Sequence, residues 1–357
     1  MRPSILSCLI AIALASGAFA SPESGSPGSP PVPAASAPLP ERLGDTGLFA
    51  PGTLTARSSV LAYAPRYPLW SDGATKRRWL SLPPGTSIDA SSPDAWNFPV
   101  GTRLWKEFGF DAPVETRMIE RTADGEWRFA VYVWEASGED AVLAPAPGIP
   151  RLPVAAAPGG RYDIPSQDDC RSCHEGAAVP VLGVSAVQLA HDCDAGTVHT
   201  GWLCESEIDL RSLVQRGLVS DLPDSVLKNS PEIAAPSATA RSALGYLHAN
   251  CGHCHNDSGS LDELDLVLAQ TVAPGIDSVQ KVLDSLVGRP SEFRTRDLET
   301  RLVPGHPESS LLTARMRSRN PVLQMPPLGT RIVDTEGLAL VERWIQQELT
   351  SREELKQ

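Results

Sequence analysis

Apolar and polar residues alternate over several segments in the first half of the chain. A period of two is typical of β-strands, because successive side chains point to opposite faces of a sheet. We therefore expect an antiparallel sandwich or a barrel-like sheet in this half of the chain. The alternating runs are GTRLWKEF (101–108), VETRMIER (114–121) and GEWRFAVYVWEA (125–136).

The last two of these runs are separated by Asp124-Gly125, a dipeptide that favours a tight hairpin turn. In the run that follows the turn, one set of apolar side chains falls on a common face. That set is Trp127, Phe129, Val131 and Val133.

The second half of the chain has the helical period instead. Apolar residues recur there at intervals of three and four, which places them on one face of an α-helix. One such helix runs directly into the cysteine at position 251. The helical stripes lie in 207–219, in 238–251 and in a final segment with Leu338, Val341, Ile345 and Leu349.

These patterns predict a multi-domain protein with a β-rich, sandwich-like N-terminal domain followed by a mainly α-helical region. Its length of 357 residues agrees with two or three domains. Segments rich in proline and serine cannot bury a core and separate the predicted domains; 145–160 is read as a second linker. The predicted segments are a signal peptide (1–20), a linker (21–44), a β-rich domain (45–150), a first cofactor region (155–230) and a helical domain (233–350).

The N-terminus has the pattern of a secretory signal peptide. Arg2 supplies the positive charge, Ile5 to Ala15 form an apolar stretch, and Ala18-Phe19-Ala20 is a small-x-small cleavage site. We therefore expect a periplasmic protein that has lost Cys8 with its signal peptide. No later stretch is apolar enough to span a bilayer, so we expect no transmembrane segment in the mature chain.

The charge of the chain changes the list of expected partners. The formal net charge is −12, and phosphate backbones are bound by basic surfaces. Nucleic acid is therefore an unsuitable partner, and we expect other proteins instead.

Two C-x-x-C-H segments carry the candidate chemistry: Cys170-Arg-Ser-Cys173-His174 and Cys251-Gly-His-Cys254-His255. This pattern is typical of covalent haem c, because two thiols at this spacing form thioethers to the two vinyl groups and the adjacent imidazole ligates the iron. We therefore expect two covalently bound haem c groups. Two alternatives do not fit the sequence. A zinc ribbon needs its two cysteine pairs about 15–20 residues apart, whereas 77 residues separate Cys173 from Cys251. A thioredoxin-like dithiol needs a βαβ unit, and the pattern of the chain predicts none.

Methionine is a common second axial ligand of haem iron in electron carriers. Met325 follows the second motif in QMPPLGT, where the prolines prevent a helix. Met316 falls in a predicted helix, where methionine usually fills a core. We therefore assign His174 and His255 as the proximal ligands and Met325 as the distal ligand of the second haem.

The second axial ligand of the first haem is left open by the sequence. His191, His199, Met118 and an open position are the alternatives, and each of these residues also has an ordinary structural use. The remaining mature cysteines, Cys193 and Cys204, are expected to form a disulfide in an oxidising compartment.

Three further groups of residues allow two interpretations each. Lys76, Arg77 and Arg78 form either a docking patch for an acidic redox partner or, as we expect, a solvated strand end. Glu115 and Arg117 form either a buried pair or a surface ladder. His253 either lines a haem propionate or, as we expect, faces solvent.

In its ordered combination of segments, the chain resembles a family of proteobacterial di-haem c-type cytochromes over residues 45–350. Within that stretch, residues 233–350 resemble a class I cytochrome c domain. The resemblance implies haem binding and electron transfer but no substrate. One departure is His191 in QLAHD, which is not carried over as a ligand. The matching segments are YPLWSDGA (67–74) with Lys76, Arg78 and Trp79, ETR (115–117), IPSQDDCRSCH (164–174), VLGVSAVQL (181–189), CGHCH (251–255), PGHPESSLLTARM (304–316) and MPPLGT (325–330).

The sequence thus predicts an exported di-haem c-type cytochrome that performs one-electron transfer with redox partner proteins. The alternative is a haem-dependent oxidoreductase, of the peroxidase or oxidase kind, with an open first haem. A third interpretation makes the β-rich domain a partner-binding or carbohydrate-binding module.

Overall fold

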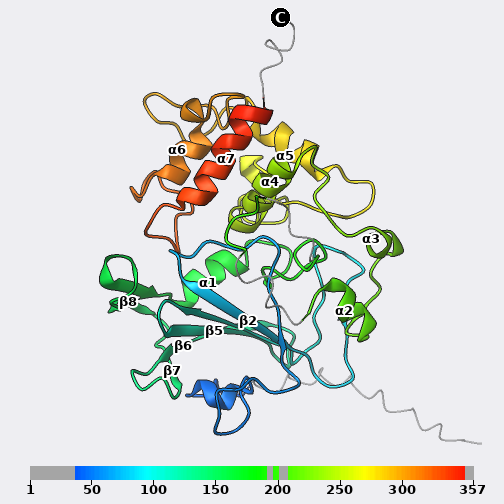
Figure 1. Cartoon of the computed structure of the whole chain (residues 1–357), viewed down its shortest axis with the longest axis vertical. Helices are drawn as coiled ribbons and strands as arrows, with labels where there is room; N and C mark the ends of the chain where they lie inside the picture. Colours follow the sequence, from blue (N-terminus) through cyan, green and yellow to red (C-terminus); the bar gives the residue numbers. More distant parts are fainter. Residues whose placement is uncertain (1–36, 191–195, 201–207, 350–357) are drawn as a thin grey trace, which may run out of the picture. The chain divides into compact units, whose positions relative to one another are not determined.

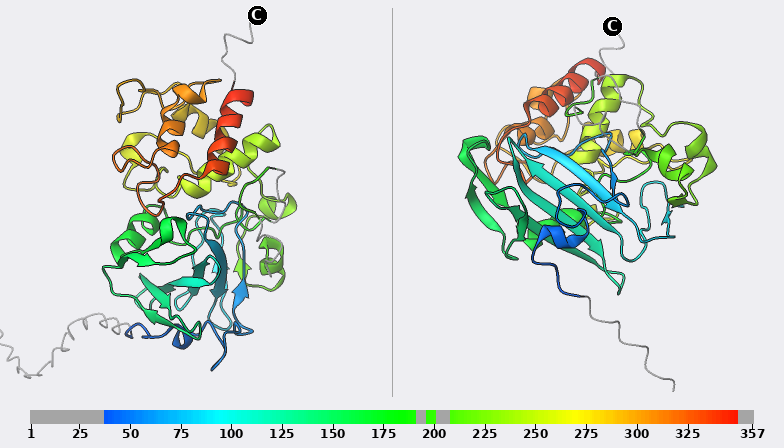
Figure 2. Two further views of the ribbon diagram at one scale, coloured as in Figure 1. Left: turned by 60° about the vertical axis from the view of Figure 1, so that its left-hand side comes forward. Right: turned by 60° about the horizontal axis from the view of Figure 1, so that its bottom comes forward.

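The computed structural model describes residues 37–190, 196–200 and 208–349 (Figure 1). Its largest sheet has six antiparallel strands in the order β1-β2-β4-β5-β6-β7. The strands, coloured from cyan to green, can be followed from two further directions in Figure 2. Their bounds are β1 Leu61–Ala62, β2 Thr75–Ser81, β4 Arg103–Gly109, β5 Pro113–Arg121, β6 Trp127–Trp134 and β7 Ala141–Leu143.

The predicted hairpin is confirmed between β5 and β6, whose register pairs Arg121 with Trp127. The turn is closed by the Thr122 N–H, which donates to the Glu126 carbonyl at 2.8 Å. Gly125 has a φ of +87° there, a left-handed conformation that glycine adopts without steric cost.

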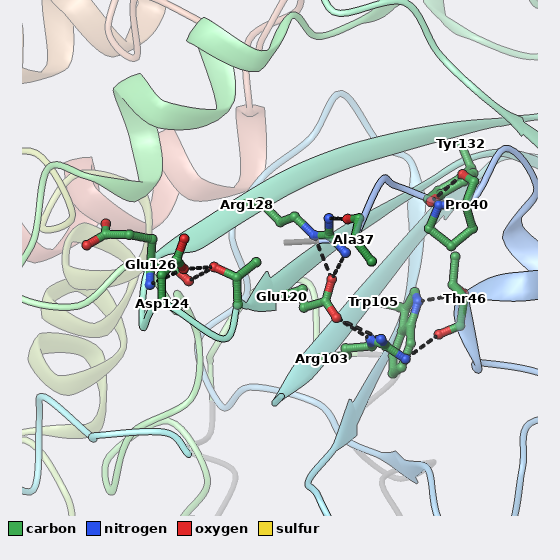
Figure 3. Close-up of polar contacts among 11 residues, drawn as sticks. Ala37, Pro40, Thr46, Arg103, Trp105, Glu120, Asp124, Glu126, Arg128 and Tyr132 are labelled. Carbon is green, nitrogen blue, oxygen red and sulfur yellow. Dashed lines mark hydrogen bonds and ion pairs between the residues drawn. The ribbon is translucent and has the colours of Figure 1, made fainter. Parts of the chain in front are cut away.

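One face of this sheet packs against the N-terminal residues of the described chain. Figure 3 shows Trp105 Nε1 donating to Thr46 Oγ1 at 3.1 Å and the Tyr132 hydroxyl donating to the Pro40 carbonyl at 3.1 Å. Leu43 is completely buried in the same layer. The core cluster on this face comprises Leu43, Leu48, Phe49, Val60, Trp79, Trp105, Met118, Ala130, Tyr132 and Ala141.

The opposite face of the sheet carries the apolar side chains predicted after the turn. Phe129 and Val131 pack there with Tyr162, Ile164 and Cys170, and Trp127 and Val133 join at the margin. Both faces of the sheet are thus covered, which is why few of its strand residues reach solvent.

The sandwich-like arrangement is not observed in the described residues. The sheet is open at β1 and β7, and the other two sheets have only two strands each. Alternation predicts strands with two different faces, but it does not say whether a second sheet or other segments cover them. The small sheets pair β3 (Ile88–Asp89) with β10 (Val219–Ser220) in parallel and β8 (Ile149–Pro153) with β9 (Arg161–Ile164) in antiparallel orientation.

Two predicted linkers contribute to the folded structure. The stretch 145–160 contains β8 and the short 3₁₀ helix η2 (Pro158–Gly160). The end of the stretch 21–44 enters the 3₁₀ helix η1 (Leu43–Thr46). Proline is tolerated in such edge strands and turns, so a proline-rich composition does not exclude them.

The C-terminal region is mainly helical, as predicted. Helix α4 packs against α7, and Figure 1 shows the two helices next to each other. Their facing side chains belong to one apolar core with Leu244, Leu247, Val341 and Trp344. The helices are α1 Gln167–His174, α2 Leu210–Gln215, α3 Asp224–Lys228, α4 Ala238–Asn250, α5 Ser278–Leu286, α6 Leu311–Arg317 and α7 Thr335–Glu348, with the 3₁₀ helices η4 Asp262–Leu264 and η5 Pro307–Ser309.

A close approach at Gly245 joins the β-rich half to helix α4. A Cβ atom on Gly245 would lie 2.2 Å from the Tyr67 ring, so the ring fits only because the side chain is absent. Tyr67 belongs to the segment that leads into β2, and its backbone N–H donates to Gln188 Oε1 at 3.0 Å. The tyrosine thereby fixes the position of α4 relative to the segment between β1 and β2.

Most of the buried apolar residues described between 181 and 226 share a core with the sheet rather than forming one of their own. Leu210 and Leu213 of α2 are buried with Leu80 and Leu104 of the sheet and with Trp96. All described residues belong to one compact unit, Ala35–Gln357. Within the described residues, no helix has the length and apolar character needed to cross a membrane. The predicted signal peptide, 1–20, lies outside the described residues.

Candidate haem-binding cavity

The first C-x-x-C-H motif lies in helix α1, whose start is fixed by a capping box. Ser166 accepts from the Asp169 N–H at 3.0 Å, and the Asp169 carboxylate accepts from the Ser166 N–H at 2.9 Å. The helix places His174 beside Phe129 of β6, with ring centres 5.3 Å apart. Cys170 packs into the core on this face of the sheet.

The second motif begins where α4 ends. The Cys251 N–H donates to the Leu247 carbonyl at 2.9 Å, and the His255 N–H donates to the Cys251 carbonyl at 2.9 Å, so the backbone continues as a tight turn through the motif. The segment before β2 contacts the same helix end, because the Trp70 N–H donates to Asn250 Oδ1 at 2.7 Å.

The two motif segments touch each other. Asn256, directly after the second motif, donates from Nδ2 to the Gly176 carbonyl at 2.8 Å. A Cβ atom on Gly176 would lie 2.8 Å from the His253 carbonyl, so the backbones could not approach this closely with any other residue there. Two motifs 77 residues apart in the sequence are therefore adjacent in the fold.

One cavity of about 1250 Å³ extends along both motifs. This volume exceeds the range of about 300–1,000 Å³ that is usual for a single small-molecule site. Much of its wall is apolar, with Leu104, Ile119 and Phe129 on the sheet side. All seven residues assigned from the sequence line this cavity: Cys170, Cys173, His174, Cys251, Cys254, His255 and Met325.

Both motif histidines are suited to bind iron through a neutral ring. His174 Nδ1 donates to the Pro180 carbonyl at 2.6 Å, which fixes the tautomer and leaves the lone pair on Nε2. Burial lowers the pKa of His174 to about 4 and that of His255 to about 4, so both are uncharged at neutral pH. His255 Nδ1 is buried without a hydrogen-bond partner in the described structure.

The four motif thiols are held in the protonated form. Burial raises the pKa of Cys170 to about 11, that of Cys251 to about 12 and that of Cys254 to about 11, and it also raises the pKa of Cys173. A redox-active dithiol instead has a lowered pKa on its attacking cysteine. The surroundings of these cysteines therefore favour structural or covalently modified thiols over a dithiol enzyme.

The two methionines of the helical region lie in different surroundings. Met316, in α6, is buried in the core shared by α4 and α7, although part of it also reaches the cavity wall. Met325 lies in the non-helical segment between α6 and α7, where its N–H donates to the Arg315 carbonyl at 3.1 Å. Its half-buried side chain lines the cavity, which is the placement that the ligand assignment requires.

Two of the candidates for the remaining ligand of the expected first haem have their side chains directed elsewhere, although part of Met118 also reaches the cavity wall. Met118 packs with Trp79, Trp105 and Tyr132 on the other face of the sheet, opposite to its neighbour Ile119. His199 Nε2 bonds to Asp334 at 2.9 Å, and this histidine is not part of the cavity wall. His191 and the predicted Cys193–Cys204 disulfide lie outside the described residues.

Several polar residues in the cavity wall could not be assigned from the sequence. Trp70 Nε1, Arg319 Nε and Thr330 Oγ1 are buried in it without a hydrogen-bond partner in the described structure. Trp70 stands in the YPLWSDGA segment, but nothing in the sequence indicates that it meets residues 319 and 330. Unpartnered buried donors are rare in folded proteins, and these three are placed to donate to a bound polar group. A haem propionate has the matching acceptor oxygens.

Three interpretations left open by the sequence are decided by the structure. Glu115 is fully buried and accepts from Arg117 Nε at 2.9 Å, so the two form a buried pair. His253 lines the cavity with a buried Nδ1, so the expected exposure to solvent is wrong. Of the three basic residues 76–78, only Arg77 has the surroundings of a solvated strand end. Arg78 is buried and faces the cavity.

No family model, curated protein or solved structure matches this chain. Within the described residues, no group of three or more His, Cys, Asp or Glu side chains is arranged to hold a metal ion. A haem iron needs only one or two axial ligands from the protein, because the porphyrin supplies the other four donors.

A buried histidine just before the second motif makes stability depend on pH. His248 Nδ1 accepts from the Gln270 N–H at 3.1 Å, and burial lowers its pKa to about 4. Its folded pKa lies below the unfolded value of about 6.5, so the unfolded state binds more protons below that pH. The free energy of unfolding should therefore fall as the pH drops from about 6.5 towards 4.

The substitution His248→Asn removes this titration but retains an acceptor atom near the position of Nδ1. Between about pH 4.5 and 6, the slope of unfolding free energy against pH should become shallower by up to about 1.4 kcal/mol per pH unit. Denaturant titrations at several pH values measure this slope. Equal slopes for His248→Asn and for His306→Asn, which removes an exposed histidine, would contradict the assignment.

Proposed function

We propose that this protein is a periplasmic di-haem c-type cytochrome that transfers single electrons between redox partner proteins. The observation that carries the proposal is that both C-x-x-C-H motifs and Met325 line one cavity larger than a single-ligand site. The N-terminal sequence pattern supports export, and the acidic composition argues against nucleic acid as a partner.

Each motif supplies a complete set of groups for one covalent haem c. Cys170 and Cys173 would anchor the first haem and Cys251 and Cys254 the second, while His174 and His255 present neutral imidazoles as proximal ligands. Haem iron, once bound, supplies a centre that changes between ferric and ferrous states by one electron. The chain's part is to hold both groups next to each other in an apolar cavity.

For residues 233–350 we propose a class I cytochrome c domain. The support is the order of its parts: α4 runs into the motif, α6 precedes the Met325 segment, and α7 packs back onto α4. The family resemblance of residues 45–350 points to the same interpretation. Met325 would be the distal ligand of the second haem, with His255 as its proximal ligand.

A second candidate function is a haem-dependent oxidoreductase in which the first haem has an open position. The observation in its favour is that Met118 and His199 are both engaged elsewhere. An open position would allow the first haem to bind a small molecule, and the second haem would then relay electrons.

Carbon monoxide distinguishes the two candidates, because it binds reduced haem only where a coordination position is free. For the electron carrier we expect the reduced, undenatured protein to keep its absorption spectrum under carbon monoxide. A spectral change that involves half of the haem would favour the oxidoreductase.

The haem assignment predicts two covalent haems per chain. Protein purified from the bacterial envelope should give a c-type pyridine haemochrome with two haems, which stay attached on denaturing gels. Cys170→Ala combined with Cys173→Ala should leave one haem, and Cys251→Ala combined with Cys254→Ala should leave the other. Complete extraction of haem into acidified acetone would refute covalent attachment.

The ligand assignment predicts a change confined to one haem in Met325→Leu. Leucine has a similar volume, so the fold should survive with a loss of less than about 1.5 kcal/mol. Loss of the thioether sulfur should lower the reduction potential of the second haem and remove its sulfur-to-iron absorption band. Met316→Leu is the matched control and should leave both signals in place; the reverse pattern would transfer the assignment to Met316.

A further inference from the structure

Three cations stand side by side on the sheet face that lines the cavity. The register places Arg78 of β2 opposite Lys106 of β4, and Lys106 opposite Arg117 of β5. All three line the cavity. We call these three residues the cationic row. Like charges directly opposite one another destabilise a sheet, so such a row needs a compensating negative charge.

The protein itself supplies only part of that charge. Arg117 is paired with Glu115 at 2.5 Å. Neither Arg78 nor Lys106 makes an ion pair in the part of the chain that the structure describes, and Lys106 Nζ instead lies 4.8 Å from the centre of the Phe108 ring. Burial and the neighbouring cations lower the pKa of Lys106, and the nearby Glu115 carboxylate offsets this lowering only in part.

The other face of the same sheet is built differently. There Glu120 stands between Arg103 and Arg128 in register and accepts from both, at 2.8 and 2.7 Å (Figure 3). Arg77 on that face is paired with Glu107 at 2.7 Å. On that face each strand arginine therefore lies next to a carboxylate on a neighbouring strand. The cationic row has no such carboxylate between its members.

The row next to these cations is entirely apolar. Leu80, Leu104, Ile119 and Phe129 follow one another across β2, β4, β5 and β6 in register. Phe129, at the end of this apolar row, contacts His174 of the first motif. The cavity-facing side of the sheet thus presents an apolar strip beside a positively charged one, next to a proposed haem ligand. A haem has the complementary form, an apolar macrocycle with two carboxylates on one edge.

We propose that the cationic row Arg78–Lys106–Arg117 binds the propionate carboxylates of the first haem. The proposal rests on the proposed function, since it requires a haem at the first motif. A free carboxylate or oxyanion has the same chemistry, and the experiment below distinguishes it from the propionates. Neither Arg78 nor Lys106 forms an ion pair within the described residues, so they are the residues to test.

The test compares Lys106→Met and Arg78→Met with Arg77→Met, which removes the same charge from the other face of β2. Haem content is measured first, and all variants should retain two haems. In spectroelectrochemical titrations, the potential of the first haem should fall in the two row variants, because unpaired propionates favour the ferric state. The potential of the first haem should be unchanged in Arg77→Met, and also in Lys106→Arg, because that variant keeps the positive charge.

A stability measurement distinguishes propionate binding from a merely nearby charge. In the background Cys170→Ala/Cys173→Ala, which lacks the first covalent haem, Lys106→Met should raise the melting temperature because it relieves the repulsion within the row. In the two-haem protein the same substitution should lower it. This reversal of sign is the coupling between Lys106 and the haem in a double-mutant cycle.

Each remaining outcome counts against the proposal. Two haems with an unchanged potential in Lys106→Met and Arg78→Met would overturn it while leaving the di-haem assignment intact. Inorganic phosphate, added at constant ionic strength, tests for binding of free anions. A saturable shift of the first haem's potential in the parent protein but not in Lys106→Met would show that the cationic row binds free anions. That result would also overturn the propionate proposal and leave the di-haem assignment intact. A chain that contains no haem would overturn this proposal and the proposed function together.

Discussion

The contact between Gly176 and the second C-x-x-C-H segment is the constraint on which the cavity depends. The absence of a side chain at Gly176 lets the His253 carbonyl approach, and the Asn256 amide bonds to the Gly176 carbonyl. Because each motif is anchored to a different framework, α1 on the sheet and α4 in the helical core, this contact joins the two frameworks where their cysteines lie. A single cavity along both motifs is the consequence.

The sheet has different electrostatic functions on its two faces. On the face that packs against the N-terminal residues, every cross-strand row with cations also contains a carboxylate, such as Glu120 between Arg103 and Arg128. Such rows need nothing from outside the chain. On the cavity face the cationic row is left with excess positive charge in surroundings of low polarity, where an uncompensated charge is costly. The same sheet can therefore stabilise the fold with one face and hold an anionic group with the other.

His174 and His255, which would hold the two irons in the proposed electron carrier, line one largely apolar cavity. Burial keeps both histidines neutral and raises the pKa values of the motif thiols, which disfavours dithiol chemistry. The feature that separates a simple carrier from an enzyme is the second axial position of the first haem. Met118 and His199 have other partners, so the choice between the two functions depends on that one coordination position.

The chain's local patterns determined the elements and the chemistry-bearing residues. The period of two predicted β4, β5 and β6, and Asp124-Gly125 predicted the hairpin between β5 and β6. The apolar stripes predicted α4 and α7. All of these features depend on neighbours within a few residues, so a local pattern is enough to predict them. The seven cavity residues could be identified for a similar reason, since a c-type motif is a short contiguous pattern and the prolines after Met325 act locally.

Only the tertiary structure decided how these pieces meet. Lys76, Arg77 and Arg78 look alike in sequence, yet the strand alternation and the covering segments place Arg77 outside and Arg78 in the cavity. The row formed by Arg78, Lys106 and Arg117 depends on the register of three strands, and the junction at Gly176 and Asn256 joins residues 80 positions apart. Register and long-range packing arise from the fit of remote surfaces, which a local pattern does not encode.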